Sequence, residues 1–141
     1  MINLILGKKG SGKTKKLIEQ ASEVVAQSNG NVIMIVKGSN LTFDLNHKVR
    51  LINIDDYKIC SFCGLYGFVC GLCAGNYDLT NILIDSILDI CGTNVADFND
   101  FIKKLNLLTE KCGIKLTLST SLSSSDLTPE VNLIVNYKSG I

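Results

Sequence analysis

Residues 7–14 read Gly7-Lys8-Lys9-Gly10-Ser11-Gly12-Lys13-Thr14, which matches the pattern G-x-x-x-x-G-K-[ST] at every fixed position. An apolar run over 2–6 precedes this segment and predicts a buried strand, and apolar residues at helical spacing follow it over 15–27. In a strand, glycine-rich loop and helix N-terminus of this order, backbone N–H groups and the positive end of the helix dipole face a bound anion. The sequence therefore predicts a phosphate-binding loop at residues 7–14.

Lys13 and Thr14 carry the specific chemistry of such a loop. The Lys13 ammonium can reach the β- and γ-phosphate oxygens of a nucleoside triphosphate, and the Thr14 hydroxyl can take one coordination position of Mg²⁺. The glycines let the backbone fold around the anion without Cβ clashes. No Asn-Lys-x-Asp sequence, which a small-GTPase guanine pocket needs, occurs in the chain. We therefore expect ATP and Mg²⁺ as ligands, with cofactor contacts from Gly7, Lys8, Lys9, Gly10, Ser11, Gly12, Lys13 and Thr14.

A second nucleotide signal lies at Asp85, directly after the apolar run Ile82-Leu83-Ile84. A buried strand that ends in a carboxylate can place Asp85 beside the loop, where it would orient Thr14 or a water bound to Mg²⁺. The alternative is a structural cap at a turn or helix start. Lys13 and Asp85 are the candidate catalytic residues, and Thr14 and Asp85 are the candidate Mg²⁺ residues.

Strand-like runs recur along the chain, mostly alternating with helical segments. This alternation predicts one α/β domain over residues 1–141, with a mostly parallel sheet of about five to six strands between helices on both faces. Ligands of such sheets bind at the carboxyl ends of the strands. The expected strands are 2–6, 31–36, 49–54, 81–85, 114–119 and 131–137, the expected helices are 15–27, 57–75 and 95–112, and the expected loops are 41–48 and 120–130.

Composition and charge narrow the class of protein. The chain is 46% hydrophobic, which favours a compact core, and its net charge of +1 gives no overall field for nucleic acid or membranes. Residues 59–77 carry no charged side chain, but four glycines favour a core helix over a membrane span. The first strand begins at residue 2, which leaves no room for a signal peptide. Six cysteines without an export signal indicate the cytoplasm.

With these two motifs, the chain resembles the P-loop NTPase superfamily, in which they are the Walker A and Walker B sequences. It is most similar to the RecA-like or additional-strand branch, and within it to small clostridial P-loop ATP-binding proteins. The resemblance covers essentially the whole chain and implies a three-layer fold. It also implies a further strand between the loop strand and the acidic strand, and residues 114–120, with Ser119 near their end, resemble that polar-ended sensor strand.

The chain departs from this branch at the residue after Asp85. ATPases of the branch usually carry a glutamate there that activates the attacking water, whereas Ser86 cannot act as a base at neutral pH. Asp55 and Asp56 follow another predicted strand and are candidates to replace it, although a solvated turn is the alternative. Arg50, the only arginine, lies inside a strand pattern, so an arginine finger in cis is not expected. These departures predict nucleotide binding with weak hydrolysis, or hydrolysis stimulated by a partner protein.

Four cysteines form two C-x-x-C pairs, namely Cys60, Cys63, Cys70 and Cys73. Four thiolates could enclose Zn²⁺, but the six residues between the pairs are fewer than in zinc ribbons. Redox chemistry and buried free thiols are the alternatives, and the surrounding apolar residues favour buried thiols.

Glycines recur at every fourth residue within the same predicted helix, at Gly67, Gly71 and Gly75. Close packing of the helix on the sheet is one explanation, and contact between helices of a homodimer is another. The leading expectation is thus an ATP–Mg²⁺ binding protein with weak ATPase activity. The alternatives are a non-hydrolysing switch or assembly subunit, a small P-loop kinase, and a zinc module.

Overall fold

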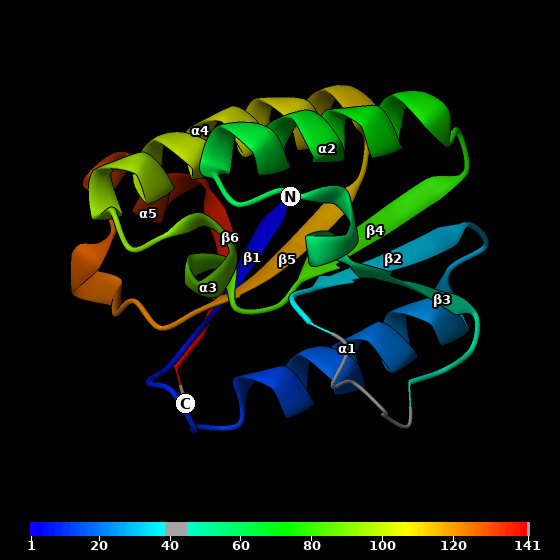
Figure 1. The fold of residues 1–141 in the computed structure, drawn as a ribbon, viewed down its shortest axis with the longest axis horizontal. Helices are drawn as coiled ribbons and strands as arrows, with labels where there is room; N and C mark the ends of the chain where they lie inside the picture. The colour runs from blue at the N-terminus through cyan, green and yellow to red at the C-terminus, as the bar shows by residue number, and fades with distance from the viewer. Residues whose placement is uncertain (39–44, 141) are drawn as a thin grey trace.

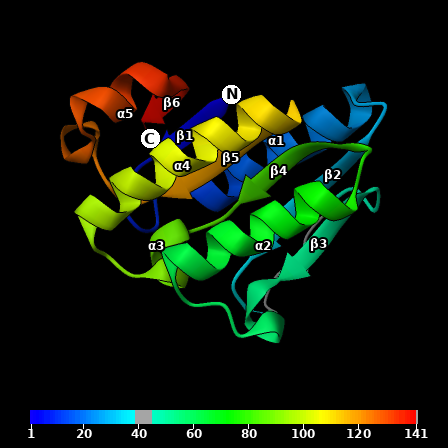
Figure 2. The same ribbon diagram turned by 90° about the horizontal axis from the view of Figure 1, so that it is seen from above.

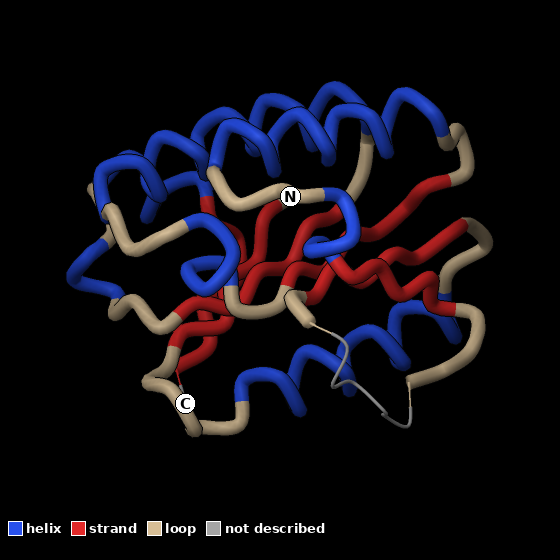
Figure 3. The backbone as a smooth tube through the Cα atoms, viewed as in Figure 1, coloured by secondary structure: helices blue, strands red, loops and turns tan. Residues whose placement is uncertain are grey.

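The computed structural model describes residues 1–38 and 45–140. Six parallel strands form one sheet in the order β3-β2-β4-β5-β1-β6 (Figures 1 and 3). The expected α/β architecture with a parallel sheet of five to six strands is confirmed. The strands are β1 (Ile2–Leu6), β2 (Asn31–Val36), β3 (Val49–Asn53), β4 (Leu79–Ile84), β5 (Lys115–Thr120) and β6 (Val135–Gly140).

Helices cover both faces of the sheet, which gives three layers. Helix α1 lies alone on one face, and α2 and α4 run side by side over the other, as Figures 1 and 2 show. The helices are α1 (Lys13–Gln27), α2 (Phe62–Gly75), α3 (Ile87–Cys91), α4 (Val95–Cys112) and α5 (Pro129–Ile134), with short 3₁₀ turns at Ile54–Tyr57 and Ser124–Asp126.

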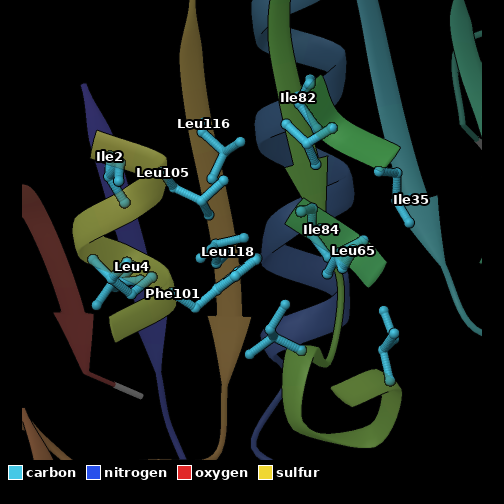
Figure 4. Packing of buried hydrophobic residues seen from close by; sticks show 14 of the residues in the cluster. Ile2, Leu4, Ile35, Leu65, Ile82, Ile84, Phe101, Leu105, Leu116 and Leu118 are labelled. Atoms are coloured by element: carbon cyan, nitrogen blue, oxygen red, sulfur yellow. The ribbon is translucent and has the colours of Figure 1, made fainter. Parts of the chain in front are cut away.

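Two hydrophobic cores lie on opposite faces of the sheet, because side chains of a strand alternate between its faces. On the larger side, Leu4 and Ile84 pack in one cluster with Phe101 and Leu105 of α4 and with Leu65 of α2 (Figure 4). On the smaller side, residues of the alternate strand positions pack with Leu17, Ala21 and Val25 of α1. Burial on both faces explains the continuous apolar runs of the central strands.

Strand β5 lies between β1 and β4. This is the strand order that the resemblance implied for the loop strand and the acidic strand. Ile5 pairs with Ser119, and Ile84 pairs with Leu118. The register therefore brings residue 7, residue 85 and the end of β5 to the same carboxyl edge.

The last strand begins later than expected. Residues 131–137 were predicted as a strand, and residues 120–130 as a loop, but Pro129–Ile134 form α5. The Thr128 hydroxyl caps this helix by accepting a hydrogen bond from the Val131 N–H at 3.2 Å, and Pro129 occupies its first turn, where a missing N–H costs nothing. The start signal of a helix therefore overrides the β-branched composition that follows it.

The helix predicted over 57–75 is shorter, and a helix after Asp85 was not predicted. Helix α2 begins at Phe62 because the Ser61 hydroxyl accepts a hydrogen bond from the Gly64 N–H at 3.0 Å. The short helix α3 starts at Ile87.

The predicted loop 41–48 falls partly outside the described residues. Among the helices of residues 1–38 and 45–140, none has both the length and the hydropathy needed to cross a bilayer.

Candidate functional site

The loop between β1 and α1 is shaped by two glycines with positive φ. Gly10 has φ 80° and Gly12 has φ 90°, which are left-handed values that side chains other than glycine rarely adopt. The loop is anchored at its start, where the Gly7 N–H donates to the carbonyl of Thr120 on β5 at 3.3 Å. At its end the Lys16 N–H donates to the Gly12 carbonyl at 3.1 Å and closes the first turn of α1.

Helix α1 differs from α2, α4 and α5 at its N-terminus. Those three helices are capped by the side chains of Ser61, Asn94 and Thr128. Gly12 supplies no side-chain cap to α1, and the first turn of α1 holds no acidic residue. The first N–H groups of a helix have no partner within the helix, so those of α1 are available to an external anion.

The Lys13 side chain is folded back over the loop. Its ammonium donates to the carbonyls of Gly7 and Lys8 at 2.5 and 2.8 Å, and the residue is only 8% exposed. Burial lowers the pKa of Lys13 below its ordinary value, and the opposing effect of the Asp85 carboxylate, which raises it, is smaller. A buried ammonium held by neutral carbonyls gains from an added anion, so the Lys13 site suits a phosphate.

The structure brings the predicted residues Thr14 and Asp85 together. The Thr14 hydroxyl lies 3.1 and 3.0 Å from the two carboxylate oxygens of Asp85. Asp85 follows β4 and is held there by its own N–H, which donates to the carbonyl of Ile35 on β2 at 3.0 Å. A hydroxyl beside a carboxylate at a phosphate loop is a suitable Mg²⁺ site, because Mg²⁺ commonly takes one or two protein oxygens and fills its remaining positions with phosphate and water.

Ser119 fixes the orientation of Asp85. Its hydroxyl, which is fully buried in β5, donates to Oδ1 of Asp85 at 2.9 Å and accepts from the Ser86 N–H at 2.7 Å. Ser86 has a left-handed backbone with φ 54°, which turns the chain sharply from β4 into α3. Asp85 therefore accepts hydrogen bonds from two hydroxyls, those of Thr14 and Ser119. The resemblance of residues 114–120 to a polar-ended sensor strand had pointed to Ser119.

Asp55 and Asp56 were candidates for the missing base, and the structure gives them other surroundings. Asp55 forms an ion pair with Lys37 at 2.8 Å, and this contact raises the pKa of Lys37. Asp56 is exposed in the same 3₁₀ turn. Among residues 1–38 and 45–140, neither carboxylate forms a hydrogen bond or ion pair with the phosphate loop, so both fit the alternative of a solvated turn after β3.

Asp89 is a site residue that the sequence analysis missed. It lies in α3, one helical turn after Ser86, and its carboxylate is 3.6 Å from the Lys9 ammonium of the loop. As a smaller effect, the negative charge of Asp89 also raises the pKa values of Lys13 and Lys37. In the sequence, the spacing of four residues between Asp85 and Asp89 could have pointed to this residue. That spacing brings Asp89 to the loop only because the segment between them folds into a turn and a short helix.

The four clustered cysteines do not form a common site. Cys60 and Cys63 are exposed, and Cys70 and Cys73 are half-buried farther along α2. Burial raises the pKa of Cys73 to about 12, with smaller contributions from its neighbour Cys112. Among residues 1–38 and 45–140, no three His, Cys, Asp or Glu side chains converge into a group that could hold a metal ion. The expectation of deeply buried thiols is also wrong for Cys60 and Cys63.

The glycines of α2 do not serve close packing. A Cβ atom placed on Gly67, Gly71 or Gly75 would meet no other atom within 4 Å, and all three residues are exposed. The explanation that the helix needs them to approach the sheet is therefore wrong. The large side chains of α2 that reach the core, Leu65 and Val69, lie on another side of the helix.

The chain matches no model of a known protein family, and no curated protein matches it in sequence.

Proposed function

We propose that this protein is a cytoplasmic member of the P-loop NTPase superfamily that binds ATP with Mg²⁺ and hydrolyses it slowly. The observation that carries the proposal is the contact of Thr14 with Asp85 across 71 positions of sequence. The sequence predicted that Asp85 would lie beside the loop and orient Thr14 or a water bound to Mg²⁺, and the two residues meet at the edge where parallel sheets bind ligands. Six free thiols suit a reducing compartment.

In this proposal the phosphates lie in the loop formed by residues 7–14. The N–H groups at the uncapped start of α1 would bind the phosphate oxygens, and the Lys13 ammonium would exchange its two carbonyl partners for them. Thr14 and Asp85 would hold Mg²⁺, which supplies charge neutralisation between the phosphates. Ser119 would keep the Asp85 carboxylate pointed at Thr14.

For hydrolysis, the proposal assigns to Asp89 the place that glutamate usually takes after the acidic strand. The carboxylate of Asp89 would accept a hydrogen bond from the attacking water and orient it. Its contact with Lys9 places it at the loop, and its exposure lets it change rotamer. An exposed aspartate paired with a lysine is a weaker base than a desolvated glutamate, so slow turnover is expected without a partner protein.

A non-hydrolysing switch is the second candidate function, and the geometry of Ser86 favours it. Ser86 is fixed by its hydrogen bond to Ser119 and brings no carboxylate to the site. The kinase alternative has less support, because Arg50 lies on β3, and three strands separate β3 from β1. The expected preference for ATP over GTP rests on the absence of a guanine-binding motif from the sequence, and the calorimetry below includes both nucleotides.

Titration calorimetry with ATP, GTP and a non-hydrolysable ATP analogue, each with and without Mg²⁺, tests the proposal. We expect Mg²⁺-dependent binding of ATP that Lys13→Ala weakens by about 100-fold or more, because two charge-assisted hydrogen bonds are lost. Lys15→Ala is the matched control, because Lys15 is an exposed lysine in the same turn of α1. Absence of heat for every nucleotide at millimolar concentration, with the protein folded, would remove the proposed function.

A further inference from the structure

A cavity of about 550 Å³ lies between α2 and the edge strand β3, away from the phosphate loop. Lys48 and Arg50 lie on its strand side, and Phe68, Gly71 and Gly75 on its helix side. Arg50 pairs in register with Ile33 of β2, which belongs to the core under α2. The side chain of Arg50 therefore lies on the same face of the sheet as α2. No residue of the loop 7–14 lines the cavity, and neither does Asp85.

The cavity is open because α2 presents glycines toward β3. A side chain on Gly71 or Gly75 would find free space, since a Cβ atom there meets nothing within 4 Å. Glycine inside a helix costs up to about 1 kcal/mol relative to alanine at each position. No close contact offsets this cost, and larger residues would cover apolar surface of Ile33 and Ile52 that now faces the cavity. The glycines on this side of α2 therefore lower the stability of the protein and keep the cavity accessible.

Two exposed cations, Lys48 and Arg50, border the cavity, and within residues 1–38 and 45–140 neither has an acidic partner. The lining of the cavity contains no acidic residue. On the helix side, the rings of Tyr57 and Phe68 pack at a centroid distance of 5.4 Å and form an aromatic wall. An unpaired guanidinium near aromatic surface is complementary to a carboxylate attached to a flat apolar group.

We propose that the cavity between α2 and β3 is a second binding site, which takes a small ring-bearing organic carboxylate. The carboxylate would bind Arg50 and Lys48, and the ring would lie against Phe68 and over the bare backbone of Gly71. The volume is in the range of small-molecule sites, and the combination of apolar walls with a few charged groups is typical of them. The site is separate from the proposed nucleotide site and does not depend on it.

The test is a titration of the intact protein with naphthoate, followed by two-dimensional NMR of the backbone amides, with the neutral isostere naphthamide as the comparison ligand. We expect saturable shifts confined to the amides of β3 and of α2 around Gly71, with naphthamide binding about tenfold more weakly or worse. The Lys13→Ala variant should bind naphthoate as the unchanged protein does, which separates this site from the phosphate loop.

Two variants locate the site. Arg50→Gln should weaken naphthoate binding by about tenfold or more, whereas Lys115→Gln, which removes an exposed lysine from the start of β5, should not. Gly71→Leu should fill the cavity and abolish binding, while Gly67→Leu, one turn earlier on the same exposed side and outside the cavity, should leave it intact. Equal affinity for naphthamide, equal binding by Arg50→Gln, or shifts confined to residues 7–14 would each overturn the proposal, as would no binding at millimolar concentration.

Discussion

The hydroxyl of Thr14 lies 3.1 and 3.0 Å from the two carboxylate oxygens of Asp85, although 71 positions of sequence separate the two residues. Thr14 is the second residue of α1, and Asp85 follows β4, with β5 between β4 and the loop strand β1. The pair is held from a third side by Ser119 of β5. Three elements thus fix one oxygen-rich position next to the Lys13 ammonium.

Replacing the carboxylate of this pair tests the metal assignment. Asp85→Asn removes one negative charge but keeps an oxygen acceptor for Thr14 and Ser119, so we expect a folded protein. The affinity gain that Mg²⁺ gives to ATP should fall by about tenfold or more, because Mg²⁺ prefers charged oxygen ligands. Calorimetry with and without Mg²⁺ measures this gain. Asp78→Asn, in an exposed turn, is the control, and an unchanged Mg²⁺ effect in Asp85→Asn would contradict the assignment.

A second substitution separates binding from turnover. Asp89→Asn should lower the rate of phosphate release by roughly 10²-fold or more, in the range usual for a lost general base, while affinity for the non-hydrolysable analogue changes little. Phosphate release and calorimetry on the same preparations provide the two readouts. Asp55→Asn, which breaks the ion pair with Lys37, should keep its turnover. If Asp55→Asn and Asp89→Asn lost activity equally, the special role of Asp89 would be wrong.

Two leucines of α4 provide a matched test of the core. Leu105 is fully buried, whereas Leu107 is 69% exposed. Leu105→Ala should lower the free energy of unfolding by about 2–5 kcal/mol, through lost burial and the cavity left behind. Leu107→Ala should change it by less than about 0.5 kcal/mol. Urea denaturation measures both changes in the free energy of unfolding, and similar losses for the two variants would contradict the side of α4 that faces the core.

The cysteines should differ in their reaction with iodoacetamide at mildly alkaline pH. Cys60, Cys63 and Cys112 are exposed, whereas burial raises the pKa of both Cys73 and Cys91 to about 12. Because the thiolate is the reactive form, the three exposed thiols should be modified first. Mass spectrometry of peptides at increasing times gives the order, and early modification of Cys91 would contradict its burial at the end of α3.

The same two thiols predict a fall of stability at high pH. Cys73 and Cys91 have pKa values near 12 in the folded protein, against an ordinary value of 9.0. Above pH 9 the unfolded chain therefore binds fewer protons than the native state, and the free energy of unfolding should decrease as the pH rises toward 12. Urea denaturation over this range measures the slope. Cys91→Ala should make the slope shallower, and an identical slope would exclude a contribution from Cys91.

The central strands and the loop could be predicted from the sequence because their signals are local. A short apolar run, ended by Gly7 in one case and by Asp85 in the other, is enough to place β1 and β4. The loop pattern places Lys13 and Thr14 at the start of α1. The contact between Thr14 and Asp85 followed from the rule that carboxyl ends of parallel strands share an edge.

Other features depended on competition between signals or on distant packing. In residues 128–134 a threonine cap and a proline outweighed β-branched residues, so a helix precedes β6. The place of Asp89 depended on the backbone of Ser86, which a sequence pattern does not specify. The glycines of α2 gave a clear periodicity, but periodicity alone does not say which side of a helix faces the sheet. Here Gly71 and Gly75 line the cavity, and Gly67 lies exposed outside it.

The pairing of β6 with β1 has a practical consequence for experiments. Gly140 pairs with Leu6, the residue before the loop, and Ser139 contacts Lys16 of α1. A purification tag fused after residue 140 would therefore emerge beside the proposed nucleotide site and could obstruct it. Strand β1 starts at the opposite edge of the sheet, so affinity handles for ligand measurements are better attached at the amino end.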